Sequence, residues 1–259
     1  MKKVIKKIAI KLINPIATRL GYSRGQKVVF TKNLFDKNSL LEIFFSNIKA
    51  MGFAPKHIID VGANHGTWTR ETLKYFPDSY YTLVEPQEWL KPSLQDILDT
   101  NSKVSFNAVG AGDKSGSFMF TIVDRDDSCS FRYTEEEAKA GGYQQIEIPI
   151  VTLNEMVAKN HSLPFPDLVK IDAEGLDIAV LEGASDLFGR TEVFMVEAAI
   201  FNKEFENSLL KMIDYMDKKG YNLFEITDLN RPFQPYVLWL VELAFVKKNG
   251  VLDTYKISY

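Results

Sequence analysis

The sequence has little of what disulfide-rich, zinc-binding or membrane-spanning proteins need. It contains one cysteine, Cys129, and three histidines among 259 residues. A single cysteine excludes an internal disulfide, and the scattered histidines lack zinc-site spacing. No apolar run approaches the ~18 residues of a membrane-spanning helix. A chain of this length, 46% hydrophobic, can bury enough apolar surface to fold without disulfides or bound metal ions. The single cysteine is most compatible with a reducing compartment.

Acidic residues are absent from positions 1–35, which carry nine lysines and arginines. The remaining chain holds 22 basic and 34 acidic side chains, a net charge of −12. Binding to the nucleic-acid backbone requires clustered positive charge, so we expect no nucleic-acid partner for this acidic part of the chain. Lysines also interrupt the apolar residues near the N-terminus, which therefore lacks the continuous apolar core of a secretion signal. We expect a cytoplasmic protein.

Residues 4–13 place apolar side chains at helical spacing with lysines on the opposite face, and Pro15 ends or kinks that helix. One interpretation is peripheral contact of residues 1–20 with an anionic membrane at its inner face. The other is a helix packed on the domain with its lysines solvated. The composition leaves both open.

Further along, short apolar segments alternate with amphipathic ones, which predicts an α/β fold with a mostly parallel sheet and helices on both faces. The predicted strands cover 57–61, 80–85, 104–109, 168–172, 193–197, 221–226 and 238–247. The predicted helices cover 37–51, 67–75, 89–99, 152–160, 176–188 and 205–219. We divide the chain into an N-terminal helical cap or arm, residues 1–52, and one domain, residues 53–259.

Two features refine this topology. The interval 113–151 interrupts the alternation, and we interpret it as a strand pair with a loop, 124–142, inserted into the domain. Ser128, Cys129 and Ser130 in that loop either close over a ligand or belong to an ordinary surface loop. The last two strands have no room for a crossover helix between them, so they should pair antiparallel at one edge of the sheet.

The strongest local signal is an apolar strand that runs into Gly62 and Gly66 before a helix begins. Glycines let the backbone turn sharply and approach a ligand. The free N–H groups of the new helix then face the crevice where the strands end. Glu85, nineteen residues after Gly66, can accept hydrogen bonds from both ribose hydroxyls. Together these features indicate an adenosine-containing cofactor.

The carboxylate at the entrance of this turn bears on which cofactor binds. Dinucleotide sites usually have G-x-G-x-x-G, whereas this turn is Asp60-x-Gly62-x-x-x-Gly66. A carboxylate is unfavourable beside a diphosphate and favourable beside the ammonium and sulfonium of S-adenosylmethionine. The turn therefore favours S-adenosylmethionine, with S-adenosylhomocysteine as product. The alternatives are an NAD(P)-dependent oxidoreductase using the same crevice and a non-catalytic module that keeps the cofactor pocket.

Several motifs in order resemble the FkbM family of methyltransferases over roughly residues 55–200. They are Ile59-Asp-Val-Gly-Ala-Asn-His-Gly66, Val84-Glu-Pro86, Asn107-Ala-Val-Gly110, Val151-Thr-Leu-Asn154, Val169-Lys-Ile-Asp-Ala-Glu-Gly175, Val180-Leu-Glu-Gly-Ala184 and Val196-Glu197. The resemblance implies a Rossmann-like, seven-stranded methyltransferase fold with an antiparallel last strand. It also implies S-adenosylmethionine as donor and, usually, O-methylation of a sugar or polyketide hydroxyl. The expected partner is a small-molecule or glycan acceptor.

The predicted cofactor-binding residues come from the turn, the end of the second strand, the residues after the third strand and the acid after the fourth. They are Asp60, Gly62, Ala63, Asn64, Gly66, Thr67, Glu85, Pro86, Asn107, Ala108, Val109 and Asp172.

Three acids should lie at the carboxyl ends of adjacent parallel strands and line the same crevice: Asp172, Glu174 and Glu197. A sugar hydroxyl loses its proton during attack, and a positioned carboxylate can take it. Crowded carboxylates raise each other's pKa, which suits a base near neutrality. We predict Asp172 or Glu174 as the base and Glu197 as the residue that positions the acceptor. Alternatively, Asp172 holds the methionine ammonium, Glu174 caps the next helix, or the acids bind Mg²⁺ or Mn²⁺; we assign no metal site.

Overall fold

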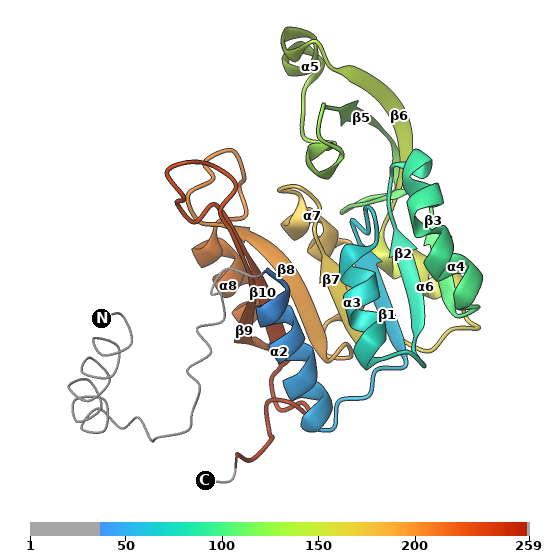
Figure 1. Cartoon of the computed structure of the whole chain (residues 1–259), viewed down its shortest axis with the longest axis vertical. Helices are drawn as coiled ribbons and strands as arrows, with labels where there is room; N and C mark the ends of the chain where they lie inside the picture. Colours follow the sequence, from blue (N-terminus) through green and yellow to red (C-terminus); the bar gives the residue numbers. More distant parts are fainter. Residues whose placement is uncertain (1–36, 258–259) are drawn as a thin grey trace, which may run out of the picture. The chain divides into compact units, whose positions relative to one another are not determined.

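Seven strands form the central sheet of the computed structural model, which describes residues 37–257 (Figure 1). In spatial order they are β3 (Val104–Asn107), β2 (Tyr80–Val84), β1 (His57–Val61), β7 (Leu168–Ile171), β8 (Val193–Ala199), β10 (Leu240–Lys247) and β9 (Tyr221–Asn230). All neighbours pair in parallel except β10, which is antiparallel to both β8 and β9. The predicted antiparallel pairing of the last two strands is confirmed, with β10 inside the sheet and β9 at its edge.

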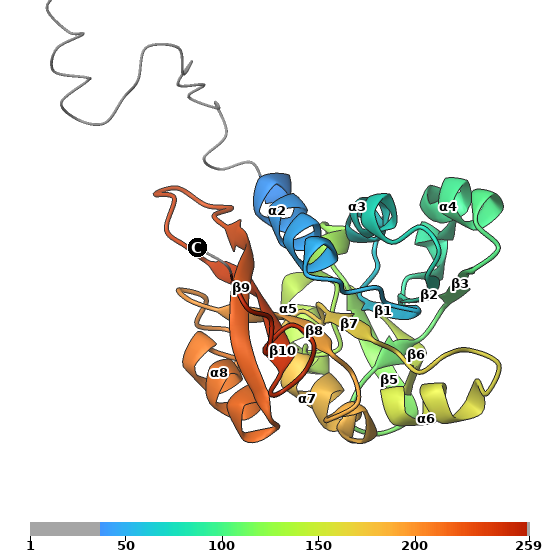
Figure 2. The ribbon, with the colours of Figure 1, turned by 90° about the horizontal axis from the view of Figure 1, so that it is seen from below.

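Helices cover both faces of this sheet (Figure 2). One face carries α2 (Lys37–Ala50), α3 (Thr67–Tyr75) and α4 (Gln95–Thr100), and the other carries α6 (Leu153–Lys159), α7 (Asp177–Glu182) and α8 (Leu209–Lys218). Because successive strand residues point to opposite faces, Ile58 joins the apolar cluster on the α2 side and Ile59 the cluster on the α7 side. Both side chains are fully buried. Since both faces of β1 are therefore covered at these positions, the sequence there does not alternate between apolar and polar residues. The predicted α/β architecture is confirmed.

The inserted segment forms a small second sheet above the carboxyl ends of the parallel strands (Figure 1). Its strands are β4 (Gly110–Ala111), β5 (Gly116–Ile122) and β6 (Gln144–Val151), with β5 antiparallel and β4 parallel to β6. The loop expected over 124–142 contains a short 3-10 turn, η2 (Asp126–Ser128), and a helix, α5 (Glu135–Gly141). A reciprocal capping box between Thr134 and Glu137 starts α5.

Three predicted helices are shorter than expected, each for a local reason. The segment 89–99 begins as a 3-10 helix, η1 (Glu88–Leu94), because Pro92 has no N–H for an α-helical bond. Another, 176–188, stops at Glu182 and resumes as η3 (Ser185–Leu187). Between them Gly183 packs against the Gly112 carbonyl, where any Cβ would clash. The third, α8, starts only after its capping residue Ser208.

Residues 37–257 belong to one compact unit. The helix α2 belongs to it, since Phe44, Phe45 and Ile48 are buried with sheet residues on that face. The division at residues 52 and 53 stays a prediction. The expected helix over 4–13 and the membrane contact of residues 1–20 lie outside the described residues. Within residues 37–257, no helix is long and apolar enough to cross a bilayer.

Candidate functional site

The glycine turn after β1 is wedged between the ends of two neighbouring strands. Gly62 and Gly66 have φ angles of 72° and 74°, which favour glycine. The N–H groups of Gly62 and Ala63 donate to the Val84 carbonyl at 2.9 and 3.2 Å. On the other side, a Cβ on Gly62 would overlap the Asp172 carbonyl. The turn therefore needs glycine at 62 for both its conformation and its close packing.

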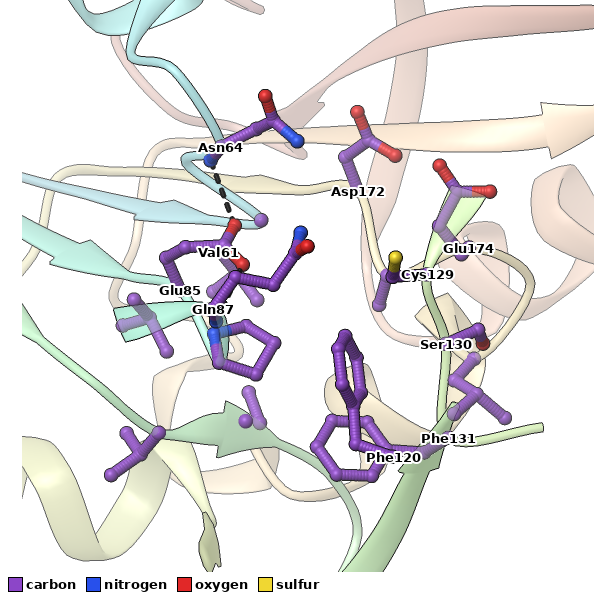
Figure 3. Close-up of a pocket in the computed structure, with 18 of the residues that line it drawn as sticks. Val61, Asn64, Glu85, Gln87, Phe120, Cys129, Ser130, Phe131, Asp172 and Glu174 are labelled. Carbon is purple, nitrogen blue, oxygen red and sulfur yellow. Dashed lines mark hydrogen bonds between the residues drawn. The ribbon is translucent and has the colours of Figure 1, made fainter. Parts of the chain in front are cut away.

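Glu85 fixes this turn from the end of β2. Its carboxylate accepts a hydrogen bond from the backbone N–H of Asn64 at 2.8 Å (Figure 3). It accepts another from the backbone N–H of Gln87 at 2.9 Å. Only 3% of Glu85 is exposed, and burial raises its pKa although these hydrogen bonds oppose the shift. Each carboxylate oxygen keeps a second lone pair for a ligand. The predicted proximity of Glu85 to the glycine turn is therefore present in the structure.

A solvent-open pocket lies above the turn. Its walls come from the turn, the end of β2, the inserted sheet and the segment after β7. The predicted cofactor residues that line it are Gly62, Asn64, Glu85, Pro86, Val109 and Asp172. Those that do not are Asp60, Ala63, Gly66, Thr67, Asn107 and Ala108.

The inserted segment supplies a wall that the sequence analysis did not assign. The rings of Phe120 and Phe131 pack at 4.7 Å between centroids and face the pocket opposite Asn64 and Asp172 (Figure 3). Cys129 and Ser130 also line it, so of the two interpretations of this loop the ligand-facing one fits. Burial raises the pKa of the Cys129 thiol, which disfavours the nucleophilic thiolate form.

Hydrogen bonds attach this wall to the glycine turn through Asp126. Its carboxylate pairs with the His65 imidazole at 2.7 Å. Its backbone carbonyl accepts from the side-chain amides of Asn64 at 3.3 Å and Gln87 at 2.8 Å. The Gln87 amide oxygen is buried in the same place without a hydrogen-bond partner. The pocket is thus closed on one side by residues that are 61 positions apart in the chain.

A buried cation, Lys170, lies beneath the pocket and was also missed by the sequence analysis. Its Nζ is 3.4 Å from carboxylate oxygens of both Asp60 and Asp172, and it donates to the Gly62 carbonyl at 3.1 Å. Burial alone would lower the Lys170 pKa, but the carboxylates of Asp172, Asp60 and Glu242 raise it above the usual value. The only signal in the sequence was a charged residue inside the apolar run of β7.

This arrangement gives Asp60 a different position from the one expected. Asp60 is fully buried, accepts a hydrogen bond from the Thr69 hydroxyl and pairs with Lys170. Its carboxylate does not line the pocket, so it fixes the Lys170 ammonium rather than facing a bound donor.

Asp172 and Glu174 face the pocket from the segment after β7 (Figure 3). The Asp172 side chain is 38% exposed. Glu174 has a φ of 51°, an unusual conformation for a residue with a side chain and one that is often found at functional sites. Burial, followed by the charges of Asp172, Asp177 and Asp127, raises the Glu174 pKa to about 9. The predicted pair is thus brought together at one wall.

Glu197 lies one strand away and deeper. The pairing of Ile171 with Val196 places Asp172 and Glu197 at the same level of the sheet. Because β8 extends to Ala199, Glu197 is inside the strand rather than at its end, and it does not line the pocket. Burial and the charge of Asp172 raise its pKa, and its Oε2 is buried without a hydrogen-bond partner.

The turn that carries Glu174 is held by Asp177, another residue that the sequence analysis missed. The buried Asp177 carboxylate accepts from the Ala173 N–H at 3.2 Å and the Asn207 amide at 2.7 Å, and burial raises its pKa to about 7. The alternative that Glu174 caps the helix is wrong, since α7 has Leu176 at its N-cap and no side-chain cap. Among the described residues, no group of three or more His, Cys, Asp or Glu could hold a metal ion.

Comparison with known proteins places this geometry in context. Residues 60–223 match the family model described as the methyltransferase FkbM domain. The solved structures that are similar include magnesium protoporphyrin IX methyltransferase from Synechocystis PCC 6803 with bound S-adenosylmethionine (10% identity, 96% of this chain and 98% of that one, TM-score 0.46). Another is 1,6-didemethyltoxoflavin-N1-methyltransferase from Burkholderia thailandensis with S-adenosylhomocysteine (12% identity, 82% and 79%, TM-score 0.44). A search of curated proteins found no match.

Proposed function

Since the chain belongs to the FkbM family of S-adenosylmethionine-dependent methyltransferases, we propose that it methylates a hydroxyl oxygen, on a sugar or another small-molecule or glycan acceptor. The observation that carries this proposal is the joining of two features in one pocket. Glu85 and the glycine turn form one side, and the acid pair Asp172 and Glu174 forms another.

The residues of the pocket fit this methyl donor. Glu85 has free lone pairs for ribose hydroxyls, and the buried Gln87 amide oxygen lacks a partner that a bound nucleoside could supply. Val109 and Phe131 offer apolar surface to the adenine ring. Asp172 and Glu174 would face the cationic end. When bound, S-adenosylmethionine supplies an electrophilic methyl group on a sulfonium.

The protein's own residues would act mainly by orientation and by accepting a proton. Methyl transfer is an in-line displacement, so most of the rate gain comes from holding the acceptor oxygen in line with the methyl group. The acceptor hydroxyl would give its proton to the carboxylate of Asp172 or Glu174 as its oxygen takes the methyl group, while the carbon–sulfur bond of the donor breaks and S-adenosylhomocysteine leaves. Lys170 restrains Asp172 from below. Glu197 does not line the pocket, so it would position the acceptor through Asp172, with which it is level on the next strand.

Calorimetry followed by turnover tests this proposal. S-adenosylhomocysteine should bind the purified protein and NAD(P) should not; the reverse result would make it an oxidoreductase. Turnover of labelled donor on a panel of sugars, nucleotide sugars and glycolipids then identifies the acceptor. With that acceptor, Asp172→Asn and Glu174→Gln separate the two candidate bases. Near-wild-type rates for both, at unchanged donor affinity, would remove the base assignment.

For the location of the protein we propose the cytoplasm, with residues 1–20 contacting the inner face of an anionic membrane. Five lysines in residues 2–11 support it. Liposome co-sedimentation at low and physiological salt provides the test. Equal binding by a variant that lacks residues 1–20, or no binding at either salt concentration, contradicts the membrane contact.

A further inference from the structure

A lysine lies inside the apolar strand β7, directly beneath the pocket. The Lys170 side chain is only 5% exposed, and the other residues of this strand are apolar and buried. Burying an ammonium together with its carboxylate partners seldom adds net stability over apolar residues of similar volume. Stability alone therefore does not account for a lysine at this position, and its contacts indicate another role.

These contacts join the glycine turn to one of the two acids of the pocket wall. Lys170 donates to the Gly62 carbonyl at 3.1 Å, and its ammonium is 3.4 Å from Oδ2 of Asp172. Gly62 also packs so closely on Asp172 that a Cβ would overlap the Asp172 backbone carbonyl. One buried side chain therefore helps to fix the spacing between the turn and the first acid beside it.

Asp172 and Glu174 share this wall but differ in their surroundings. Asp172 has the Lys170 ammonium as a partner, and it lies between Asn64 of the glycine turn and Glu174 in Figure 3. Within the described part of the chain, Glu174 forms no ion pair. Burial and neighbouring carboxylates raise the Glu174 pKa to about 9, and the charge of Arg132 opposes this shift only in part. When two acids have such different environments, one commonly stays ionised while the other exchanges a proton.

The backbone, rather than a cation, fixes Glu174 in the pocket wall. Its φ of 51° is unusual for a residue with a side chain. The buried Asp177 carboxylate holds the start of this turn by accepting from the Ala173 N–H at 3.2 Å. On the other side, Gly175 packs against the Phe205 ring. Glu174 is thus held in place by contacts that do not depend on its charge.

We propose that Lys170 is a positioning residue that holds Asp172 as the charged anchor for the ammonium of the methyl donor and leaves Glu174 to accept the proton of the acceptor hydroxyl. This inference rests on the proposed function and assigns separate roles to two acids that the proposed function treats as alternatives. Lys170 acts through Asp172, because it lies below the pocket and does not line it.

The charges balance over one turnover with these roles. Glu174 is protonated in the empty pocket, and it gives this proton to solvent when the cationic donor binds. In the transfer step the oxygen–carbon bond forms, the carbon–sulfur bond breaks and the hydroxyl proton moves to Glu174. Glu174 is therefore neutral again when S-adenosylhomocysteine, whose sulfur is uncharged, dissociates. Each turnover releases one proton to solvent, at the step of donor binding.

Calorimetry with S-adenosylhomocysteine at pH 7 tests the two acids without an acceptor. Asp172→Asn should lose about tenfold or more in affinity, because the ligand ammonium loses a charged hydrogen-bond partner. Glu174→Gln should bind this ligand as wild type does, since Glu174 is already neutral beside an uncharged sulfur. Unchanged affinity in Asp172→Asn, or an equal loss in both variants, overturns the division of roles.

Turnover at saturating donor, with the acceptor that the screen identifies, tests the proton transfer. Glu174→Gln should lose about 10²–10⁴-fold in kcat, the usual contribution of a general base. Asp172→Asn should lose less in kcat than Glu174→Gln. A wild-type kcat in Glu174→Gln, or a larger loss in Asp172→Asn, assigns the proton to another group and overturns the proposal.

A double-mutant cycle tests whether Lys170 acts through Asp172. Lys170→Met should weaken S-adenosylhomocysteine binding about tenfold in the wild-type background and have no further effect in the Asp172→Asn background. Lys170→Arg, which keeps the cation, should recover most of the affinity. An equal loss from Lys170→Met in both backgrounds is the result expected of a merely structural lysine, and it overturns the positioning role. If Lys170→Met does not fold, the same cycle is run with Asp60→Asn in every variant, which removes the buried charge left without a partner.

The matched control is a second pair of a lysine and a carboxylate, at the opposite end of the sheet. Lys247 ends β10 and lies 3.5 Å from Glu192, which immediately precedes β8. Lys247→Met should change the thermal midpoint but not the affinity for S-adenosylhomocysteine, and a loss equal to that of Lys170→Met also overturns the positioning role. Failure of wild type to bind S-adenosylhomocysteine refutes the proposed function itself, whereas binding without these differences refutes only the assignment of roles.

Discussion

Glu174 should lose a proton when the cationic donor binds, and this makes donor affinity depend on pH. Its pKa in the empty pocket is about 9, raised first by burial and then by neighbouring carboxylates. At pH 7 the side chain is therefore largely neutral. A sulfonium placed beside Glu174 favours the ionised form, so binding and deprotonation are linked.

The magnitudes of the two opposing effects are similar. Ionising a group with a pKa of about 9 at pH 7 costs ~2.7 kcal/mol, at 1.36 kcal/mol per pH unit. Attraction between the ionised Glu174 and a unit positive charge about 5 Å away contributes ~3 kcal/mol at an effective dielectric constant of about 20. We therefore expect S-adenosylmethionine binding at pH 7 to release up to about one proton. Because protons are released, affinity should rise by up to about tenfold per pH unit from pH 7 to 9 and then level off.

Calorimetry in buffers of different ionisation enthalpy measures the proton count directly. S-adenosylhomocysteine serves as the control ligand, since it lacks the sulfonium charge and should release fewer protons. Glu174→Gln serves as the control variant, because it keeps the shape of the side chain but cannot titrate. In that variant the pH dependence should flatten, while Asp177 and Glu197 are still present.

Two results would refute this reasoning. One is an equal pH slope for S-adenosylmethionine and S-adenosylhomocysteine in wild type, which would mean that the sulfonium does not interact with Glu174. The other is an unchanged slope in Glu174→Gln, which would assign the released proton to a different group.

Three further changes test the parts of the pocket. Lys170→Met leaves Asp60 and Asp172 without their buried cation, so denaturant titration should show a loss of ~3–5 kcal/mol, with partial recovery in Lys170→Arg. Gly62→Ala must overlap the Asp172 carbonyl at a φ of 72°; we expect at least ~1–3 kcal/mol of destabilisation and no measurable S-adenosylhomocysteine binding, and normal affinity would contradict the packing described. Asp126→Ala removes a half-exposed pair with His65 worth at most ~1 kcal/mol, so calorimetry should show at most a fivefold loss of S-adenosylhomocysteine affinity, and a larger loss would mean that the pair does more than hold the wall.

The sequence predicted those features of the fold and site that depend on local patterns. Strand and helix alternation identified all seven strands of the main sheet, because buried parallel strands read as short apolar runs. The glycine turn and Glu85 were recognisable because a tight turn at the end of a strand requires particular residues at particular spacings. Parallel order also placed Asp172 and Glu197 on neighbouring strands at one level.

What the sequence could not supply depends on contacts between distant segments. The wall formed by Phe120 and Phe131 exists only because the inserted sheet folds over the glycine turn, and no periodicity within residues 113–151 encodes that placement. The same holds for the buried pairing of Lys170 with Asp60, which joins two strands 110 residues apart in the chain. Glu197 lies inside β8 because this strand continues two residues beyond its predicted end at 197. Pairing of Ala198 and Ala199 with β10 extends it.

The position of Asp60 changes the electrostatic basis for choosing a cationic donor over a dinucleotide. In the sequence, the Asp60 carboxylate stood at the entrance of the turn and supplied the negative charge. In the structure, Asp60 is fully buried beside Lys170 and does not line the pocket, so its carboxylate does not face a bound ligand. The selective charge comes instead from Asp172 after β7 and from Asp126 of the inserted segment, and Glu174 adds to it once it loses its proton; Asp127 is paired with Arg125. A diphosphate in this pocket would be repelled by Asp172 and Asp126, whereas a sulfonium and an ammonium would be attracted to them and would favour ionisation of Glu174. The conclusion drawn from the turn therefore holds for a different physical reason, one that requires the inserted segment to be folded over the site.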